Sequence, residues 1–451
     1  MGSARGWSVA ILDAGILFML AVWTASYAFR PFKVPHAILD ARIPVVVLAI
    51  WCVYPLIQLL PISVGSAGMI GGELHDLYGE VPNVNQSAAA YLTLDRGATL
   101  SGLIRQCGAV AVLFIVMAVT TTAFRLRTLL VVVVCVGFVE AVYGLLVYFS
   151  DDQLGLWNPG HAQVTISGTY VNQNHFAGLL EMAIPAAMGL YMSLPRESEI
   201  RTGARGIARM IFGFLQSPRG MVAFCILVMA AALILTNSRG GIGALAIGIT
   251  VAIAIAVLRK GARASELRVG VLVVTAAVIG ILWLGSGEIY ERLQSTGLSS
   301  QRGELRELSY RMIGDNAVVG TGVGTYRWVF PTYKDGRFGT YFYDHAHNDF
   351  LETLGEQGVL GFALLLSALT LIFLYLIRAF WKRHDPLSRG ALFAAIAGCT
   401  SLMVHGLVDF NLQIPANASY FFALLGVGMV AGSLRQSFES TPSTEMSLSV
   451  A

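Results

Sequence analysis

Long apolar runs constrain the fold of this chain more than any other feature of its sequence. An α-helix needs about 20 apolar residues to cross the hydrocarbon core of a bilayer. Runs of this kind predict spans near residues 9–27, 43–60, 107–123, 129–149, 175–194, 220–236, 241–258, 269–284, 358–379, 390–408 and 419–434. Backbone polar groups in lipid must be satisfied within the structure, and the alternating pattern of barrel strands does not occur. We therefore predict an all-α, polytopic transmembrane helical bundle of about 11–12 spans.

The composition agrees with a membrane protein. Hydrophobic residues make up 55% of the chain and charged residues only 13%, whereas soluble domains carry about 25% charged residues. The cysteines lie in or beside apolar runs and show no spacing typical of a disulfide or metal site. We interpret these residues as small core side chains, and they are Cys52, Cys107, Cys135, Cys225 and Cys399.

Lysine and arginine predict which connections lie on which side of the membrane. Connections rich in these residues alternate with poor ones, and basic connections stay cytoplasmic. By this parity the N-terminus lies outside, where Arg5 is the only basic residue before the first span. The connections placed together on the external side are 61–106, 150–174, 237–240, 285–357 and 409–418.

The chain divides into four parts on this prediction. Residues 1–284 hold spans one to eight, 285–357 form one long, partly helical external loop, and 358–434 hold spans nine to eleven. Apolar residues at helical spacing between 303 and 319 predict an ordered helix that lies at the membrane surface. Residues 435–451 are rich in Ser and Thr and are predicted to form a disordered cytoplasmic tail.

Titratable side chains gather just before the ninth predicted span. Within nine positions lie Asp344, His345, His347, Asp349 and Glu352. His347 is a candidate general base, because histidine is the commonest residue in that role. Two alternatives are a histidine that only satisfies backbone groups and a metal site built from Asp344, His345, His347 and Asp349. His345 and His347 share a face only in an extended chain and no further ligand pair is evident, so no metal and no cofactor are expected.

Arginines mark two external segments. Arg239 occupies a short turn between two predicted spans, where an arginine is costly and tends to mark a ligand or ion path. A guanidinium group matches diphosphate oxygens, although an arginine that extends to lipid headgroups is the plain alternative. Arg302 and Arg306 are four positions apart and project from one face of the predicted loop helix. The glycine-rich segment 320–326 permits either tight turns or close approach to a ligand.

Two further external segments carry polar groups. Asn172, Asn174 and His175 crowd the predicted start of a helix, where unpaired N–H groups and the helix dipole favour anions. Capping of the helix by either asparagine explains them equally well. The polar residues at the end of the tenth span are His405, Asp409 and Asn411. They either line the same cavity or pair with one another.

Taken in order, these motifs resemble the O-antigen ligase and polymerase superfamily. They read Thr-Tyr-Val-Asn-Gln-Asn-His-Phe-Ala-Gly at 169–178, Asn-Ser-Arg-Gly-Gly at 237–241, Gly-Thr-Gly-Val-Gly-Thr-Tyr at 320–326 and His-Ala-His-Asn-Asp-Phe-Leu-Glu at 345–352. The resemblance extends over residues 100–434. It is most specific in the second half, where the matches to the external-loop signature are His347, Asn348, Leu351 and Gly358.

The resemblance implies a GT-C-like membrane glycosyltransferase at the periplasmic face of the bacterial inner membrane, active in O-antigen, lipopolysaccharide or exopolysaccharide synthesis. It implies an undecaprenyl-diphosphate-linked glycan as donor, and as acceptor either a lipid A core, in a ligase, or a glycan repeat, in a polymerase. Arg239 with Arg302 or Arg306 would grip the diphosphate, and His347 would activate the acceptor hydroxyl with help from Asp344 or Asp349. The other predicted substrate-binding residues are Asn172, Asn174, His175, His345, Asn348 and Asp349.

The strongest alternative is a polytopic transporter or flippase of lipid-linked glycan. Transporters commonly contain internal repeats and broken helices at mid-membrane. This sequence shows no similarity between its halves, and its polar motifs fall on one predicted side, which favours an enzyme that works at one surface. The predicted partners are therefore the lipid bilayer, the donor and the acceptor, with no nucleic acid.

Overall fold

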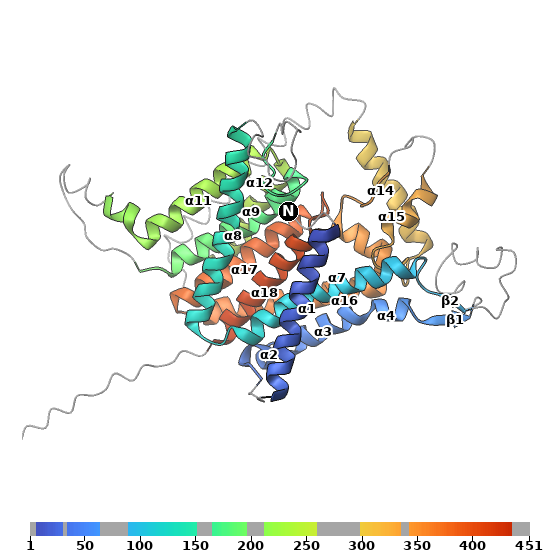
Figure 1. Ribbon diagram of the computed structural model, residues 1–451, viewed down its shortest axis with the longest axis horizontal. Coiled ribbons are helices and arrows are strands. Elements are labelled where there is room, and N and C mark those ends of the chain that lie inside the picture. The colour runs from blue at the N-terminus through green and yellow to red at the C-terminus, as the bar shows by residue number, and fades with distance from the viewer. Residues whose placement is uncertain are drawn as a thin grey trace, which may run out of the picture.

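The computed structural model describes residues 6–29, 34–63, 89–150, 165–195, 212–258, 298–334 and 342–434, with the side chains of 89 and 298–304 left out. Helices dominate, and β1 and β2 form one short antiparallel pair (Figure 1). The elements are α1 (Gly6–Phe29), α2 (His36–Asp40), α3 (Arg42–Val53), α4 (Pro55–Gln58), β1 (Pro61–Ser63), β2 (Ala89–Tyr91), α7 (Arg96–Val119), α8 (Ala123–Phe149), α9 (Gln173–Ser193), α11 (Pro218–Leu235), α12 (Arg239–Val257), α14 (Leu298–Asp315), α15 (Tyr326–Val329), η1 (Phe330–Tyr333), α16 (Asp349–Lys382), α17 (Pro386–His405), η3 (Asn411–Gln413) and α18 (Pro415–Ser433).

The prediction of an all-α polytopic bundle is confirmed. Within the described ranges, nine helices are long and apolar enough to cross a membrane: α1, α7, α8, α9, α11, α12, α16, α17 and α18. The predicted span 43–60 is interrupted, because α3 ends before Pro55 and α4 begins there. Proline lacks a backbone N–H and disfavours helix in the residue before it. The predicted span 269–284 lies outside the described residues.

Three helices form the centre of the bundle. In their most apolar windows α9, α17 and α18 are 83%, 78% and 72% buried, whereas α1 and α12 are 11% and 22% buried. Figure 1 shows α17 and α18 in the middle of the molecule. Gly189 of α9 and Gly390 of α17 face each other, and a Cβ on either would collide with the carbonyl of the other. Small residues of this kind let helix backbones pack closely in a membrane, where apolar burial alone drives no association.

The described parts of the connections predicted to be external contact one another at one end of the bundle. Leu94 donates its backbone N–H to Thr321 over 2.9 Å, and Asp349 donates to Gly406 over 2.8 Å. Gly240 lies against the imidazole of His405. Segments that are far apart in the chain therefore build one polar end.

The loop helix α14 covers much of the range predicted to be helical, but its apolar face does not face lipid. Leu305, Leu308 and Met312 are buried with Tyr326 and Phe330 in a second, smaller hydrophobic core. The apolar face of α14 therefore packs on protein, which corrects the prediction of an interfacial helix.

The helix α16 begins earlier than the predicted span. Asp349 is its first residue, and the helix continues to Lys382 through a kink at Gly358, where φ is +62°. A Cβ at Gly358 would collide with the backbone of Val318. The first turns of α16 therefore stand at the polar end, and they carry Asp349 and Glu352 of the titratable cluster.

Candidate functional site

The start of α16 is held against the segment between α17 and α18. Asn348 caps the helix, because its Oδ1 accepts hydrogen bonds from Phe350 N (3.0 Å) and Leu351 N (2.9 Å). Its Nδ2 donates to the carbonyl of Leu407 over 2.7 Å. The buried carboxylate of Asp349 accepts from Leu412 N at 3.0 Å. Asn348 and Asp349, both predicted to bind substrate, thus position the segment that carries the histidines.

Three histidines meet around one phenyl ring, and we call Phe410 with these three residues the Phe410 cluster. The ring of His345 stacks on Phe410 at 4.3 Å between centroids, and His175 and His347 meet its edge or face at 4.5 Å and 4.9 Å. His347 has a φ of +49°, a conformation that is uncommon outside glycine. The predicted segments 172–175, 345–349 and 405–411 therefore form one site. Although these imidazoles meet, no three His, Cys, Asp or Glu in the described ranges are placed to hold a metal ion.

His345 is paired with a buried carboxylate. Its Nδ1 lies 2.7 Å from Oε1 of Glu352, whose Oε2 accepts from Ala346 N at 2.8 Å. Burial lowers the pKa of His345, but the Glu352 carboxylate raises it more, to about 9. The imidazole is therefore protonated at neutral pH and cannot accept a further proton. His345 is therefore not available as a base.

Asp409 is the carboxylate that faces His347. Its Oδ1 lies 3.7 Å from Nδ1 of His347 and 3.7 Å from Nε2 of His175. Asn174 donates Nδ2 to its other oxygen over 2.8 Å. Burial raises the pKa of Asp409, yet the imidazoles of His175 and His347 lower it more, so the net pKa lies below its usual range and the carboxylate is ionised.

The carboxylates predicted to orient His347 are placed differently. Asp344 is exposed, and Asp349 is occupied by the backbone N–H of Leu412. The residue that faces His347 comes instead from the turn after α17, because the turn brings Asp409 back beside the start of α16. The sequence had shown Asp409 only as one of three polar residues without a defined partner.

Two of the predicted arginines belong to segments that adjoin Val408. Arg306 on α14 is half-buried and lines a small hollow together with Leu305, Ala346, His347 and Val408. We call this the Arg306 hollow. Arg239 is the exposed first residue of α12. A methyl group built on the next residue, Gly240, would lie 3.5 Å from Cγ2 of Val408. The turn that carries Arg239 therefore adjoins the hollow, whereas the side chain of Arg302 lies outside the described part of the chain.

A larger cavity of about 670 Å³ borders the Phe410 cluster. Of the predicted site residues, its lining includes Asn172, His175, His345 and Asp349. None of the residues that line the Arg306 hollow lines this cavity. Since His345 borders the cavity and Ala346 and His347 border the hollow, the chain at 345–347 separates them.

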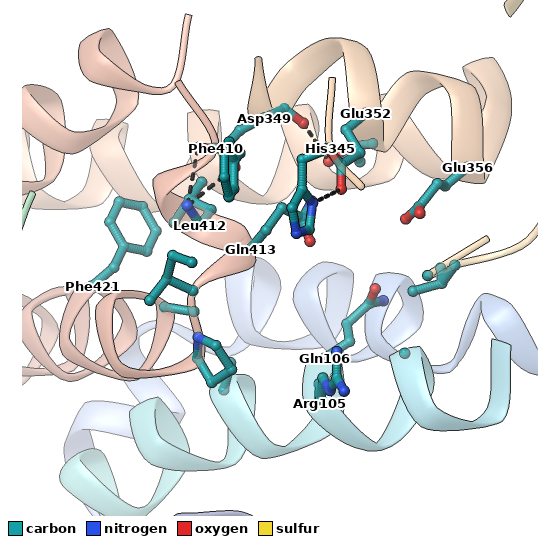
Figure 2. A pocket seen from close by; sticks show the side chains of 18 of the residues that line it. Arg105, Gln106, His345, Asp349, Glu352, Glu356, Phe410, Leu412, Gln413 and Phe421 are labelled. Atoms are coloured by element: carbon teal, nitrogen blue, oxygen red, sulfur yellow. Dashed lines mark hydrogen bonds and ion pairs between the residues drawn. The ribbon is translucent and has the colours of Figure 1, made fainter. Parts of the chain in front are cut away.

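Several residues of the cavity were missed by the sequence analysis. They are Arg105 and Gln106 of α7, Arg327 of α15, and Glu356 and Gln357 of α16. Gln106 lies across the cavity from His345 and Glu356 (Figure 2). The sequence does contain a signal, because Arg105 and Gln106 are adjacent polar residues at the end of the predicted external connection 61–106, just before an apolar run.

The glycines at 320–326 allow a tight turn to pack closely against neighbouring backbone and side chains. Gly320, Gly322 and Gly324 have φ values of +75°, +111° and +78°. A Cβ at Gly320 would collide with the backbone of Glu356, and one at Gly322 with the hydroxyl of Thr93. Of the two uses predicted for this segment, the tight turn is the one observed, and the turn joins α7 to the start of α16.

The fold and the site define a class: a multi-pass helical membrane protein with a histidine, carboxylate and arginine site at one end of its bundle. Residues 224–366 match the family model described as O-antigen ligase. This match supports membership of the O-antigen ligase and polymerase superfamily, which the motifs predicted. The matched region contains Arg239, Arg306 and His347, and it ends before Asp409 and Phe410. No curated protein matches the sequence.

Proposed function

We propose that this protein is a membrane glycosyltransferase that transfers or polymerises glycan from an undecaprenyl-diphosphate-linked donor at the periplasmic face of the bacterial inner membrane. The observation that carries the proposal is that Arg306 and His347 line one hollow, with the turn of Arg239 beside it. A charged group that neutralises a departing anion and a base that accepts a proton are the two parts that glycosyl transfer requires.

The arginines would bind the diphosphate. Arg239 begins α12, so the positive end of the helix dipole and the unpaired N–H groups of its first turn add to the guanidinium charge. Arg306 lines the hollow together with His347. Two guanidinium groups present rigid pairs of donors that suit phosphate oxygens at any working pH. The leaving diphosphate would thus be stabilised without a metal ion.

His347 would accept the proton of the acceptor hydroxyl. Its Nδ1 faces the ionised Asp409, which favours the tautomer with the proton on Nδ1 and leaves the lone pair of Nε2 available. The acceptor oxygen then forms a bond to the anomeric carbon as its proton moves to Nε2. The bond from the anomeric carbon to the diphosphate oxygen breaks, and the diphosphate leaves with the electron pair. Asp409 stabilises the imidazolium that forms, a positioning role.

The proposal is tested by supplying the purified protein with an undecaprenyl-diphosphate glycan and either a lipid A core or a second lipid-linked repeat. Products are followed by mass. Lengthened glycan identifies a polymerase, and glycan on the core identifies a ligase. Arg239→Ala and His347→Ala should abolish either product.

The controls use the same substitutions at sites away from this end. Arg125, near the start of α8, and His36, at the start of α2, are exposed, so Arg125→Ala and His36→Ala should retain activity. If no product forms and the protein instead moves the donor lipid across liposome membranes without an acceptor, the protein is a transporter and the proposal is wrong.

A further inference from the structure

A buried histidine at the end of α17 takes no part in the proposed chemistry. His405 is 1% exposed, and its Nδ1 lies 3.2 Å from Oε1 of Glu181 on α9, which is 0% exposed. Its imidazole therefore pairs with another helix, and not with Asp409 or Asn411, the partners that the sequence suggested. Ionisable side chains on membrane-spanning helices are costly, and by default they mark function.

The backbone of His405 shapes the turn that carries Asp409. The carbonyl oxygen of His405 accepts hydrogen bonds from the N–H groups of Val408 and Asp409, each over 3.0 Å. These bonds close the turn after α17, and the turn brings Oδ1 of Asp409 to 3.7 Å from Nδ1 of His347. A displacement of His405 would therefore move the carboxylate that faces the proposed base.

The imidazole of His405 supports the turn that carries Arg239. A Cβ on Gly240, the residue after Arg239, would lie 3.0 Å from Nε2 of His405. A Cβ on Gly241 would lie 3.4 Å from Cε1 of the same ring. A separation of 3.0 Å is shorter than ordinary van der Waals contact. The first turn of α12 therefore packs directly on the edge of this imidazole.

The helix α9 holds the segment 405–409 at both of its ends. At one end Glu181 holds Nδ1 of His405, so the ring is fixed with Nε2 beside Gly240. At the other end Asn174 donates Nδ2 to Oδ2 of Asp409 over 2.8 Å. Because α9 is the most buried of the membrane-spanning helices that the structure describes, this segment has a rigid support.

We propose that His405, oriented by Glu181, is a positioning residue that sets the separation between the turn of Arg239 and the turn of Asp409. The assignment rests on the proposed function, in which these turns carry the diphosphate-binding group and the partner of the base. A misplacement of 1 Å can cost about 10²-fold in rate. His405 contacts one turn through its ring and the other through its carbonyl group, so a single residue links the two.

The first test compares the same substitution at two glycines of α12. Gly240→Ala places a methyl group against Nε2 of His405, whereas a methyl group at Gly243 would meet nothing within 4 Å. The probe is farnesyl diphosphate, a short-chain polyprenyl diphosphate, titrated calorimetrically into the full chain in detergent. Gly240→Ala should weaken its binding about three- to tenfold, and Gly243→Ala should leave it unchanged. In the transfer assay Gly240→Ala should raise the KM for the donor and leave the KM for the acceptor unchanged.

A double-mutant cycle separates positioning from a general loss of stability. His405→Asn keeps an amide near the place of Nδ1, which still pairs with Glu181, but it removes the ring edge beside Gly240. Alone, it should weaken binding of farnesyl diphosphate by a similar factor, because the first turn of α12 loses its support. In combination, the smaller side chain leaves room for the methyl group of Gly240→Ala. The double variant should therefore bind no more weakly than His405→Asn, whereas independent losses would add.

Two results would overturn the inference. One is equal binding of farnesyl diphosphate by Gly240→Ala and Gly243→Ala. The other is a double variant whose loss equals the combined losses of its two single variants. Either result would show that His405 packs against α12 without setting the position of Arg239.

Failure of this inference differs from failure of the proposed function, and Arg239→Ala is the reference for both. If Arg239→Ala weakens binding of farnesyl diphosphate but Gly240→Ala does not, the diphosphate site stands and His405 is not a positioning residue. If Arg239→Ala binds like wild type, the diphosphate site is wrong and the inference falls with it. If binding follows the expectations but no acceptor receives glycan, the positioning of Arg239 stands and the transferase is wrong.

Discussion

The Arg306 hollow and the large cavity border the same three residues but differ in their chemistry. The hollow joins Arg306 to the half-exposed His347, with Arg239 nearby. The cavity joins carboxylates, amides and His345 to an apolar depth between membrane-spanning helices. The difference teaches that two histidines separated by one alanine have different surroundings, and in the proposed mechanism they have different roles. Their carboxylate partners differ, because Glu352 lies 2.7 Å from Nδ1 of His345 whereas Asp409 lies 3.7 Å from Nδ1 of His347.

The largest expected effect comes from removing the base on the hollow side. His347→Ala should lower the rate of transfer about 10²- to 10⁴-fold, the usual value of positioned proton transfer, and should leave donor binding intact. His345→Gln should change turnover far less, because His345 is already protonated, and should lower thermal stability instead. Single-turnover kinetics and donor binding, measured on both variants, separate the two. A larger loss of rate in His345→Gln would reverse the assignment.

Asp409→Asn should give the next largest effect, about 10²-fold in turnover, because an amide can favour the wrong tautomer of His347. Asp344→Asn tests the competing orientation expected from the sequence. Asp315→Asn, on α14 and away from both sites, serves as control. If Asp344→Asn costs more turnover than Asp409→Asn, the orienting role belongs to Asp344.

Arg306→Ala should raise the KM for the donor or lower turnover about ten- to hundredfold, the effect of losing one charge-assisted hydrogen bond. Arg311 lies on the same helix, but its guanidinium is exposed and paired with Glu307 at 2.7 Å. Arg311→Ala should therefore behave like wild type in the same titrations of donor. If both variants lose donor affinity or turnover equally, α14 attracts the donor through its overall positive charge, and Arg306 does not form a specific binding site.

The smallest expected effect is on the free energy of unfolding, and it comes from the pair of His345 and Glu352 that borders the cavity. The raised pKa of His345, about 9, means that the folded state holds a proton that the unfolded state releases near pH 6.5. The stabilisation by Glu352 is therefore complete below about pH 6.5 and declines as pH rises through about 9. Glu352→Gln should cost about 2 kcal/mol at neutral pH and flatten this dependence.

Thermal unfolding in detergent between pH 6 and pH 10 checks this prediction. Glu307→Gln removes an exposed partner of Arg311 and serves as control. Its melting temperature should follow the wild-type profile. A Glu352→Gln variant with the wild-type slope between pH 6.5 and pH 9 would show that His345 is not the titrating group.

Much of the fold followed from the sequence, because apolar length and the Lys/Arg pattern reflect the demands of the bilayer directly. The interruption at Pro55 and the early start of α16 did not follow. Both depend on local backbone conformation: Pro55 ends a helix inside an apolar run, and Gly358 permits a kink where a boundary was expected. The apolar face of α14 also had two possible partners, membrane and protein, which spacing alone does not distinguish.

The sequence predicted which residues belong to the site, but it did not predict which of them contact one another. Motifs identified His347, Arg239 and Arg306 as candidates, but the partner of His347 lies on another helix connection, at Asp409. The cavity could not be predicted from the sequence. Gln106 and Gln357 are far apart in the chain, and only the packing of α7 against α16 brings them into contact.

The central claim, that one end of this bundle catalyses glycosyl transfer, is tested most directly by the stoichiometry of donor breakdown in proteoliposomes. Donor is supplied with and without acceptor, and undecaprenyl diphosphate and glycan product are quantified together by mass. The account predicts equimolar release and product formation only when acceptor is present, with both lost in His347→Ala. Donor that crosses the bilayer intact without acceptor, at the same rate in wild type and His347→Ala, would contradict it.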